Sequence, residues 1–484
     1  MNPRFDLDSE ARRKLGYQLI DFIDQYFSSL SDWPVQAPLE KRTFAHLSNT
    51  LPELGKDAGT VIEEVCREMV EQGFHVPSAN YFGLMNPTPT YVAVLSEALV
   101  AALNPQLATL ARSQLASKIE LETVRWIGER VGWPGAFDGT FTSGGNEANF
   151  SGLALALAAH FSEAIEDGVG SIGSQPVVYA SGEAHHSLDK SAGLLGIGRK
   201  AVRRIPVNDR LQIDIAELER AIKRDGDAGL KPFCVVATAG TTNSGAVDDL
   251  VAVSRVCRNY ALWLHVDGAY GAAAIFSDSH RALVKGLEGC DSLTIDPHKW
   301  LAMPFSAGVI VTRHPEMLTR AFAVSTPYMP KDTAAESADN FRTSMQWSRR
   351  MNSLKLWLTL WVHGRKAYEE HFARQLELAR DFANWVRNSR DFELTVEPAL
   401  TIVNFRVKGA KGQRSLSEDE LAAANLKVVN AVTRDGQRWI SETKVNGRSV
   451  IRMMVISYLT ESRHLVALQK ALTEAAEELS TSRK

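Results

Sequence analysis

Two side chains that can do covalent and acid–base chemistry follow apolar runs in the middle of the chain. Lys299 stands in the sequence DPHKW at residues 296–300, and Asp267 stands in HVDGAY at residues 265–270. A lysine amine can hold an aldehyde as an imine, and a carboxylate can keep a ring nitrogen protonated. An enzyme needs these two groups to hold and charge pyridoxal phosphate (PLP), so the pair predicts carbanion chemistry on an amino acid.

Each of the two groups has a definite expected role. Lys299 exchanges the cofactor aldehyde with the substrate amine, and partial burial beside a cationic His298 would help it to lose its proton. Asp267 pairs with the pyridine nitrogen, so that the protonated ring accepts the electrons of the bond that breaks at the substrate α-carbon. For each residue alone, the competing interpretation is a solvated strand-end lysine and a turn aspartate.

A glycine-rich turn earlier in the chain is a candidate for binding the phosphate of that cofactor. Residues 142–149 read TSGGNEAN and lead into the helix-forming run LALALAA at 153–159. Glycines ahead of a helix let backbone N–H groups approach a phosphate, and the helix N-terminus adds a partial positive charge. Gly144, Gly145 and Asn146 are therefore candidate phosphate-side residues, although such a turn is also compatible with an ordinary helix cap.

A pair of histidines follows the apolar run PVVYA at residues 176–180. One imidazole of the sequence AHHS at residues 184–187 is a candidate for stacking on the cofactor ring or moving protons. Residue type alone does not distinguish His185 from His186. An isolated histidine at a strand end is also compatible with a structural role.

The order of these motifs resembles that of the group II PLP-dependent amino acid decarboxylases. This family has the aspartate aminotransferase fold, fold type I, and includes aromatic L-amino acid and glutamate decarboxylases. The resemblance covers nearly the whole chain, and the pairing of PHK with VD carries most of its specificity. The matching segments are ANYFG (79–83), IELE (119–122), SGGNEA (143–148), AH (184–185), TAGTT (238–242), HVD (265–267) and PHKW (297–300).

The resemblance implies a role for each matched residue. His185 corresponds to the histidine that stacks on the ring, Asp267 to the partner of the pyridine nitrogen, and Lys299 to the imine lysine. Thr242 and Asp248 correspond to residues that flank the ring. The residues that correspond to phosphate-side positions are Gly144, Gly145, Asn146 and His298.

Tyr328, in STPYMP at residues 325–330, bears on the type of reaction. It matches a mobile-loop tyrosine of the aromatic-acid decarboxylases, which is thought to protonate the carbanion after carbon dioxide leaves. Relatives that use oxygen to make aldehydes often have phenylalanine there, so the resemblance favours plain decarboxylation. Packing of a loop edge is the other interpretation of Tyr328.

The chain departs from the aromatic-acid enzymes at two places. Asp296 stands where the animal enzymes tend to have asparagine, and a carboxylate there is expected to repel the phosphate. The segment LARSQL at residues 110–115 lacks the tryptophan that helps to line their substrate pocket. Arg112 of this segment either faces an acidic substrate or lies on the surface. Whether the L-amino acid substrate is aromatic or acidic therefore stays open.

Length and composition favour a globular enzyme that handles small molecules. The 484 residues suffice for two or three domains, each with its own core. The 54 basic and 57 acidic residues give a formal net charge of -3, which offers no electrostatic basis for binding nucleic acid or an anionic membrane.

The cysteine pattern and the N-terminus bear on the compartment. The four cysteines, at positions 66, 234, 257 and 290, form no Cys-x-x-Cys pair, so neither a metal site nor a disulfide framework is predicted. The first residues lack the apolar core of a signal peptide, and two prolines interrupt the longest uncharged run, near residue 90. We therefore expect a cytoplasmic protein with reduced thiols.

An amphipathic helix is expected near the N-terminus, where apolar residues recur at helical spacing between Leu15 and Leu30. The sequence WP at residues 33–34 and the following Pro38 end this helix. Family likeness implies that the arm packs on the other subunit of a homodimer. Packing on the large domain of its own chain is the other possibility.

Beyond the arm, β-rich runs alternate with helical ones from about residue 85 to residue 345. This alternation predicts a mostly parallel sheet covered by helices, and Asp267 and Lys299 fall at the ends of its strands. The expected strands are at residues 176–180, 233–239, 262–266, 292–295 and 308–312.

The last third of the chain predicts a smaller α+β domain. Strand-like runs at 401–407 and 450–456 lie between a helix that contains Leu354 and a closing helix near 465–479, with an exposed loop at 408–413. The expected fold class is therefore α/β, a PLP-dependent transferase of fold type I. Its expected parts are a helical N-terminal arm (1–84), a PLP-binding large α/β domain with a mostly parallel sheet (85–345) and a small C-terminal α+β domain (346–484).

These features together predict a homodimeric PLP-dependent decarboxylase that converts an L-amino acid to the amine and carbon dioxide. Its expected catalytic groups are Lys299, Asp267, His185 and Tyr328. The main alternative keeps the fold but makes the protein an oxygen-using aldehyde synthase or another carbon–carbon lyase. A remote alternative is a non-catalytic binding protein on the same fold.

Overall fold

Seven short strands, mostly of β-branched and other apolar residues, form the larger of two sheets. The computed structural model describes residues 7–37, 51, 53–324, 339–408 and 416–481. Within this part only β7 runs against its neighbours in the larger sheet, which confirms the predicted mostly parallel arrangement. The strands in spatial order are β1 (Asp138–Thr142), β7 (Gly308–Thr312), β6 (Ser292–Ile295), β5 (Trp263–Asp267), β4 (Lys231–Thr238), β2 (Pro176–Ser181) and β3 (Val202–Ile205).

Helices cover both faces of this sheet, because successive side chains of a strand point to opposite faces. Val177 and Tyr179 of β2 belong to the core under one helical layer, and Val178 and Ala180 belong to the core under the other. The first layer contains α4 (Gln114–Val131), α8 (Ile215–Asp227) and α9 (Leu250–Asn259), and the second contains α5 (Gly145–His160), α6 (Glu163–Asp167), α7 (Ser187–Leu194) and α10 (Met317–Phe322). A sheet that is buried on both faces leaves its strand ends for function.

The smaller sheet is antiparallel and has four strands. Its order is β10 (Ser441–Val445), β11 (Arg448–Met454), β9 (Ile402–Val407) and β8 (Phe392–Leu394). Its core is shared with α12 (Glu418–Thr433), α13 (Ser462–Thr481) and the second half of α11 (Ser353–Asn388). The strands and closing helix expected in this region are therefore present.

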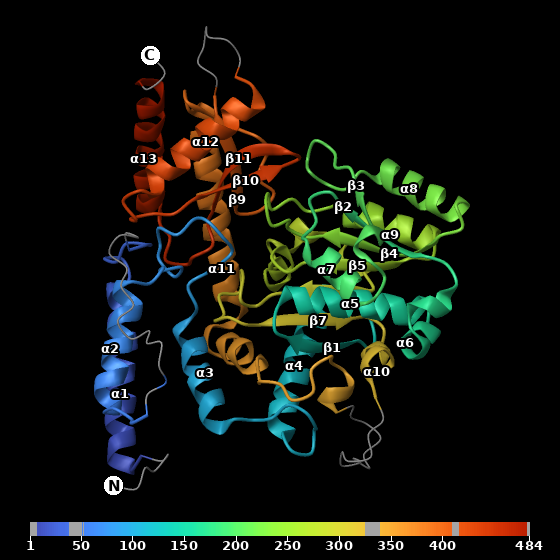
Figure 1. Cartoon of the computed structure of the whole chain (residues 1–484), viewed down its shortest axis with the longest axis horizontal. Coiled ribbons are helices and arrows are strands. Elements are labelled where there is room, and N and C mark those ends of the chain that lie inside the picture. The colour runs from blue at the N-terminus through green and yellow to red at the C-terminus, as the bar shows by residue number, and fades with distance from the viewer. Residues whose placement is uncertain (1–6, 38–50, 52, 325–338, 409–415, 482–484) are drawn as a thin grey trace.

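The long helix α11 connects the two sheets (Figure 1). Its first half packs on α3 (Tyr91–Leu103) and α4, and its second half packs on β8 and β9. The two halves meet at Gly364, whose φ of 70° and ψ of 170° lie outside the helical region. A glycine adopts this conformation without the steric cost that a side chain would add.

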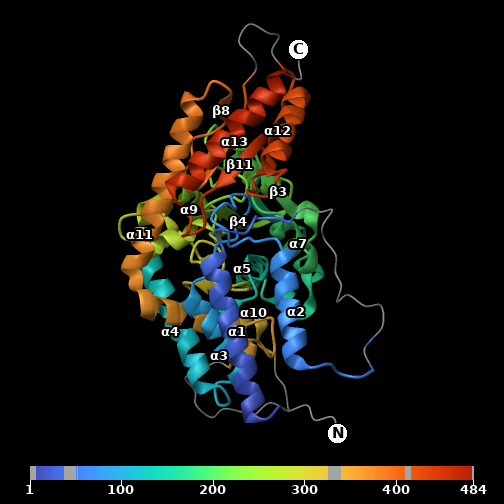
Figure 2. The same ribbon diagram turned by 90° about the vertical axis from the view of Figure 1, so that its left-hand side faces the viewer.

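The predicted N-terminal helix is confirmed as α1 (Ser9–Ser29), which Asp8 caps. It runs alongside α2 (Ala58–Glu71) at one flank of the molecule (Figures 1 and 2). No residue of α1 is buried in the single chain, and near the helix end Phe27 contacts Tyr91 of α3 with ring centroids 5.5 Å apart. The chain's own large sheet therefore does not cover the apolar face of α1.

Two further expectations concern the exposed loop after the strand at 401–407 and the lack of a membrane-spanning segment. The loop expected at 408–413 lies outside the described residues apart from Lys408. Among the helices that the structure describes, none is both long and apolar enough to cross a membrane.

Candidate active site

Loops at the carboxyl ends of β1, β2, β4, β5 and β6 surround a cavity of about 410 Å³. This cavity brings together most of the residues predicted from the sequence, which lie far apart along the chain. Its wall contains Gly144, Gly145, Asn146, Asn149, His185, Thr238, Gly240, Thr242, Asp267, Ala269, Tyr270, Asp296, His298 and Lys299, with Leu84, Met85, Asn86, Phe305, Arg452 and Met454.

Asp267 ends β5 and reaches the cavity with its carboxylate held from two sides. Oδ1 accepts a hydrogen bond from the backbone N–H of Ala269 at 3.2 Å, and Oδ2 accepts one from Nδ2 of Asn149 at 2.8 Å. The side chain is buried, so these donors matter more than they would in water. The carboxylate is therefore fixed in orientation and suited to bind a cationic group in the cavity.

Lys299 reaches the same cavity from the turn after β6, because β5 and β6 are adjacent parallel strands that end at one edge. Its Nζ lies 3.2 Å from Oδ2 of Asp296, and a quarter of its side chain is exposed. The carboxylate of Asp296 is almost completely buried. The lysine thus enters the cavity paired with a carboxylate.

His298 also lines the cavity, but the expectation that it is cationic is wrong. Burial lowers the pKa of His298 below its ordinary value, with Asp296 acting in the opposite direction. In addition, the backbone N–H of Ala307 donates to Nδ1 of His298 at 2.9 Å, so that this nitrogen carries no proton. His298 is therefore a neutral ring with its proton on Nε2, which lies 3.5 Å from Oδ2 of Asp296.

A buried lysine holds the loop that carries this N–H group. Nζ of Lys355 donates to the carbonyl oxygens of Pro304 and Ser306 at 3.2 and 3.0 Å, and it lies 2.7 Å from Oε1 of Glu97. Phe305, between the two carbonyls, packs against His298 with ring centroids 4.5 Å apart. The position of His298 therefore depends on a contact between α3 and α11.

The glycine-rich turn forms the start of α5 and fits an anionic group. Gly144 has a φ of 153°, and the first N–H groups of α5 have no partner within the helix. A Cβ atom at Gly144 would lie 3.1 Å from Cε1 of His298, and one at Gly145 would lie 2.7 Å from Oδ2 of Asp296. The absence of side chains thus keeps a cradle open between the helix start and His298, as a bound phosphate requires.

The two adjacent histidines after β2 occupy different environments. His185 lines the cavity. Burial lowers the pKa of its ring below the ordinary value, and the nearby Asp267 acts in the opposite direction. Its Nδ1 accepts a hydrogen bond from the N–H of Ser187 at 3.2 Å. The side chain of His186 is 93% exposed and contacts Asp189 instead. Of the two, His185 is the one available to a group bound in the cavity.

Two described residues considered in the sequence, Asp248 and Arg112, do not line this cavity. Asp248 is buried beside it and uses its carboxylate to accept the N–H groups of Ile213 and Thr238, at 2.6 and 2.7 Å, so it supports the end of β4. Arg112 is exposed and outside the lining. Tyr328 lies outside the described residues.

Arg452 of β11 is a cavity residue for which the sequence reasoning proposed no role. Its guanidinium is buried and donates to Oγ of Ser441 and to the backbone oxygen of Thr242, at 3.0 and 3.1 Å. Its hydrogen-bond acceptors among the described residues are all neutral oxygens, those of Ser441, Thr242 and Asn243, and no acidic side chain of the described residues forms an ion pair with it. A charged residue inside the apolar run VIRMMV was the available signal, since a strand core rarely contains an arginine without a reason.

Comparison with known proteins identifies the family. Residues 40–408 match the model of the pyridoxal-dependent decarboxylase conserved domain. The chain is 32% identical to an aromatic-L-amino-acid decarboxylase of Bacillus atrophaeus, over 100% of this chain and 99% of that protein. It is 28% identical to tryptophan decarboxylase 1 of Oryza sativa subsp. japonica, over 98% of this chain and 95% of that protein.

The solved structures agree with the sequence comparison. The structure of Oryza sativa TDC with PLP and tryptamine superposes with a TM-score of 0.92 at 27% identity, covering 99% of this chain and 100% of that one. The residues around the cavity fit the same cofactor, because an amine, a carboxylate and an open helix start line one cavity. The chain therefore belongs to the family of pyridoxal-dependent decarboxylases.

Proposed function

We propose that this PLP-dependent amino acid decarboxylase acts on aromatic L-amino acids. The observation that supports this substrate class is the small number of cationic side chains that line the cavity. Lys299 is needed for the cofactor, His298 is neutral, and Arg452 is the one arginine among the described lining residues. A substrate with two carboxylates would leave one of them without a cationic partner, at a large desolvation cost.

The apolar part of the wall favours the same substrate class. Leu84, Met85, Phe305 and Met454 line the cavity beside the polar groups, and such surfaces bind an uncharged ring by removing apolar area from water. The similar proteins of Bacillus and rice carry names of aromatic-acid and tryptophan decarboxylases. We therefore expect tryptophan, tyrosine or phenylalanine, or a close relative of these, to be the preferred substrate.

In the proposed mechanism the chain positions groups around the cofactor. Bound PLP supplies a protonated ring that accepts an electron pair. Lys299 provides the amine to which the cofactor is attached, and Asp267 holds a proton on the ring nitrogen through its fixed carboxylate. Gly144, Gly145 and Asn146 present N–H groups of the start of α5 to the phosphate, with the neutral His298 beside them.

Arg452 and His185 are assigned to the substrate side of the reaction. The buried guanidinium of Arg452 orients the substrate carboxylate, so that the bond to be broken is held in one direction. His185 carries its proton on Nε2, because its Nδ1 accepts the N–H of Ser187. With the cofactor bound, His185 would lie beside its ring and, together with Tyr328, would return a proton to the substrate α-carbon.

A panel of L-amino acids tests the proposed substrate. The purified holoenzyme is given aromatic, acidic and basic members, and carbon dioxide and amine are measured in parallel with ammonia and peroxide. Aromatic acids should give equal amounts of amine and carbon dioxide with a kcat/KM well above that of glutamate. Preferential turnover of glutamate or aspartate would contradict the substrate class, and equal amounts of aldehyde and peroxide would favour the aldehyde synthase alternative.

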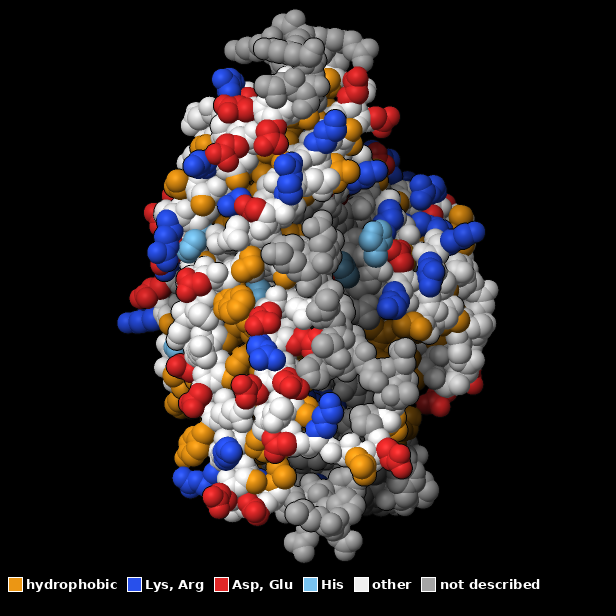
Figure 3. Space-filling view, turned by 60° about the vertical axis from the view of Figure 1, so that its left-hand side comes forward, with side chains coloured by type: hydrophobic (Ala, Val, Ile, Leu, Met, Phe, Trp, Pro, Cys, Tyr) orange, Lys and Arg blue, Asp and Glu red, His pale blue; other side chains and the backbone are white. Residues whose placement is uncertain are grey.

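We also propose that the protein is a homodimer. Apolar side chains are exposed along the flank formed by the N-terminal helices and α3, where Tyr17 is 60%, Met69 72% and Leu103 69% exposed, and Figure 3 shows hydrophobic side chains among charged ones on this side. Exposed apolar area of this kind favours association. Light scattering should give a dimer for the wild type and a larger monomer fraction for Leu103→Lys, whereas Leu194→Lys, equally exposed on α7, serves as the control.

The division of the chain and its compartment are part of the same proposal. The arm at 1–84, the large domain at 85–345 and the small domain at 346–484 agree with the separate cores of the two sheets, although α11 runs through both. A reducing, cytoplasmic location agrees with the four cysteines, all of which are free thiols. Limited proteolysis near residues 85 and 345 tests the boundaries, and cell fractionation tests the location.

A further inference from the structure

A line of buried polar side chains continues from Asp267 into the core, away from the cavity. Nδ2 of Asn149 donates to Oδ2 of Asp267 at 2.8 Å, and Oδ1 of Asn149 lies 3.1 Å from Nε2 of His265. Nδ1 of His265 lies 2.8 Å from Oγ of Ser292, which accepts the indole N–H of Trp263 at 2.9 Å. All five side chains are buried, so water does not replace these contacts.

The side chains at the two ends determine the direction in which hydrogen bonds are donated along this line. The Trp263 indole can only donate, and the ionised carboxylate of Asp267 can only accept. Ser292 accepts from Trp263, and among the described residues the one acceptor within reach of its own proton is Nδ1 of His265. His265 then carries its proton on Nε2 and donates to the carbonyl oxygen of Asn149. The amide of Asn149 is thereby oriented with its N–H group toward Asp267.

The opposite tautomer of His265 leaves the line incomplete. Nε2 of His265 also lies 3.3 Å from Oγ1 of Thr294, which could donate to it if the proton were on Nδ1. In that case Oδ1 of Asn149 would have no donor, which is costly for a buried acceptor. Burial lowers the pKa of His265 to about 4, so the ring is neutral near pH 7. A neutral ring carries its proton on either Nδ1 or Nε2. The complete set of hydrogen bonds selects the proton on Nε2.

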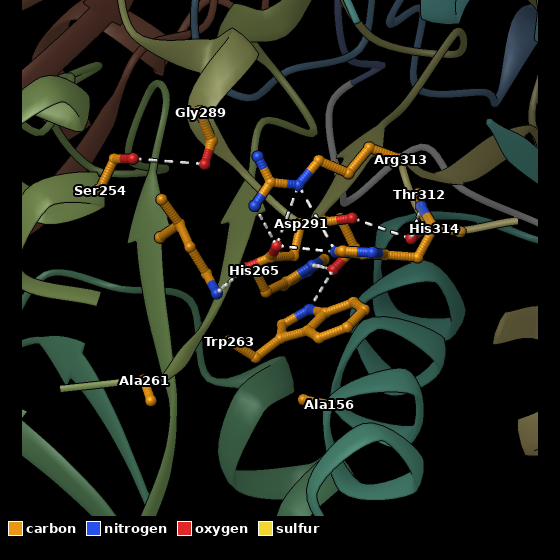
Figure 4. A network of polar contacts seen from close by, with 12 residues as sticks. Ala156, Ser254, Ala261, Trp263, His265, Gly289, Asp291, Thr312, Arg313 and His314 are labelled. Atoms are coloured by element: carbon orange, nitrogen blue, oxygen red, sulfur yellow. Dashed lines mark hydrogen bonds and ion pairs between the residues drawn. The ribbon is translucent and has the colours of Figure 1, made fainter. Parts of the chain in front are cut away.

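The fold anchors the line at its Trp263 end and at His265 in its middle. The Trp263 ring packs on His314 with centroids 4.9 Å apart, and His314 in turn binds Asp291 together with Arg313 (Figure 4). Inside α5, a Cβ atom at Gly152 would lie only 2.3 Å from Cε1 of His265. A glycine in a helix interior is less favourable than an alanine, so Gly152 lowers the stability of α5 but leaves room for the His265 ring.

We propose that Asn149, His265, Ser292 and Trp263 are positioning residues that hold the carboxylate of Asp267 aimed at the ring nitrogen of the cofactor. The inference rests on the proposed role of Asp267. None of the four is expected to react with substrate, and of the four only Asn149 lines the cavity. Without the line, the buried carboxylate loses a donor and the barrier to rotating away from the cavity, and it binds a protonated ring less well.

The experiment compares two ligands of the cofactor-free protein. One is PLP, and the other is its carbocyclic analogue, in which C–H replaces the ring nitrogen. The ratio of their dissociation constants reports the interaction of Asp267 with the nitrogen, independently of turnover. Wild type should prefer PLP, and Asp267→Asn should abolish this preference.

Three further variants locate the effect. Asn149→Ala removes the donor to a charged group and should reduce the preference for PLP by about tenfold, whereas Ser292→Ala acts two steps away and should reduce it by about threefold. The matched control is Ser187→Ala, because Oγ of Ser187 accepts from the same Asn149 amide at 3.0 Å but lies off the line. Affinity for the analogue and the melting temperature reveal any general loss of folding.

The outcomes distinguish the role of Asp267 from the role of the line that positions it. If wild type and Asp267→Asn both fail to distinguish the ligands, the assigned role of Asp267 is wrong. If Asp267→Asn loses the preference for PLP while Asn149→Ala and Ser292→Ala keep it, the role of Asp267 stands and the proposed role of the line is refuted. An equal reduction in Ser187→Ala would also refute it, because the effect would then reflect the surroundings of Asn149 in general.

Discussion

Nζ of Lys299 lies 3.2 Å from Oδ2 of Asp296, so the amine proposed to bind the cofactor is paired with a carboxylate at the phosphate side of the cavity. The other oxygen of Asp296, Oδ1, is buried and has no hydrogen-bond partner among the described residues. A second anion, the phosphate, is proposed to bind close to the same carboxylate. With the phosphate bound there, Asp296 would both retain the lysine and oppose the cofactor electrostatically.

Asp296→Asn should increase the affinity of the cofactor-free protein for PLP by roughly tenfold, because a neutral amide neither repels the phosphate nor holds the ammonium group. Titration with PLP measures the change, and competition with inorganic phosphate separates the two causes. Repulsion predicts tighter binding of phosphate alone. Asp249→Asn is the control, since asparagine also caps α9 there. Weaker PLP binding by Asp296→Asn would mean that the carboxylate supports the site.

Lys299→Ala should leave a folded protein that cannot attach the cofactor covalently. The visible absorbance of the bound cofactor should be replaced by that of the free aldehyde, and borohydride should no longer fix PLP to the chain. Peptide mapping of the borohydride-treated wild type should find the label at Lys299. A label at the buried Lys355 or any other lysine would refute the assignment.

Lys355→Met should weaken PLP binding by about tenfold, because the carbonyl groups of Pro304 and Ser306 lose their buried donor and the loop that fixes His298 is released. Arg350→Met is the matched control. Arg350 pairs with the same Glu97 but is half exposed, and no hydrogen bond or ion pair among the described residues joins it to the loop of Pro304 and Ser306. Equal PLP affinities of the two variants would mean that Lys355 acts only through Glu97. Lys355→Arg should restore part of the affinity.

The stability of the cofactor-free protein should fall as the pH drops from about 6.5 toward 4. Burial lowers the pKa of His265 and of His371 to about 4, so between pH 6.5 and pH 4 these two rings bind up to two more protons in the unfolded chain than in the folded chain. Asp248 opposes this, because burial raises its pKa to about 6 and the folded chain then gains a proton as the pH falls. Unfolding in urea at several pH values measures the slope.

His371→Gln separates one of these contributions. It removes a single titrating ring outside the cavity and should reduce the dependence of the unfolding free energy by up to about 1.4 kcal/mol per pH unit in this range. A slope identical to that of wild type would show that His371 titrates normally in the folded protein.

Tyr328→Phe tests the reaction type at a position outside the described residues. The resemblance assigns the hydroxyl to the return of a proton after carbon dioxide has left, so cofactor binding and carbon dioxide release should persist. The expected change is a rise of aldehyde, ammonia and peroxide relative to amine in air, compared with the same assay without oxygen. An unchanged product ratio at an unchanged rate would assign the proton donor to another group, with His185 the next to test.

Much of the fold was predictable because its signals are local. The strand runs at 292–295 and 308–312 coincide with β6 and β7, since short apolar runs between turns are typical of a sheet buried on both faces. Asp267 and Lys299 were placed at strand ends by the same pattern. Parallel strands bring their carboxyl ends to one edge, so their meeting in one cavity also followed from the sequence.

Other features depended on contacts between segments far apart in the chain. The protonation of His298 is determined by the N–H of Ala307 and by burial, and the availability of Arg452 depends on the second sheet closing over the cavity. The choice between His185 and His186 depends on which ring faces inward. Sequence patterns report the periodicity of burial and the types of side chains, whereas hydrogen-bond partners, desolvation and charge pairing are properties of the assembled three-dimensional neighbourhood, which only the tertiary structure decided.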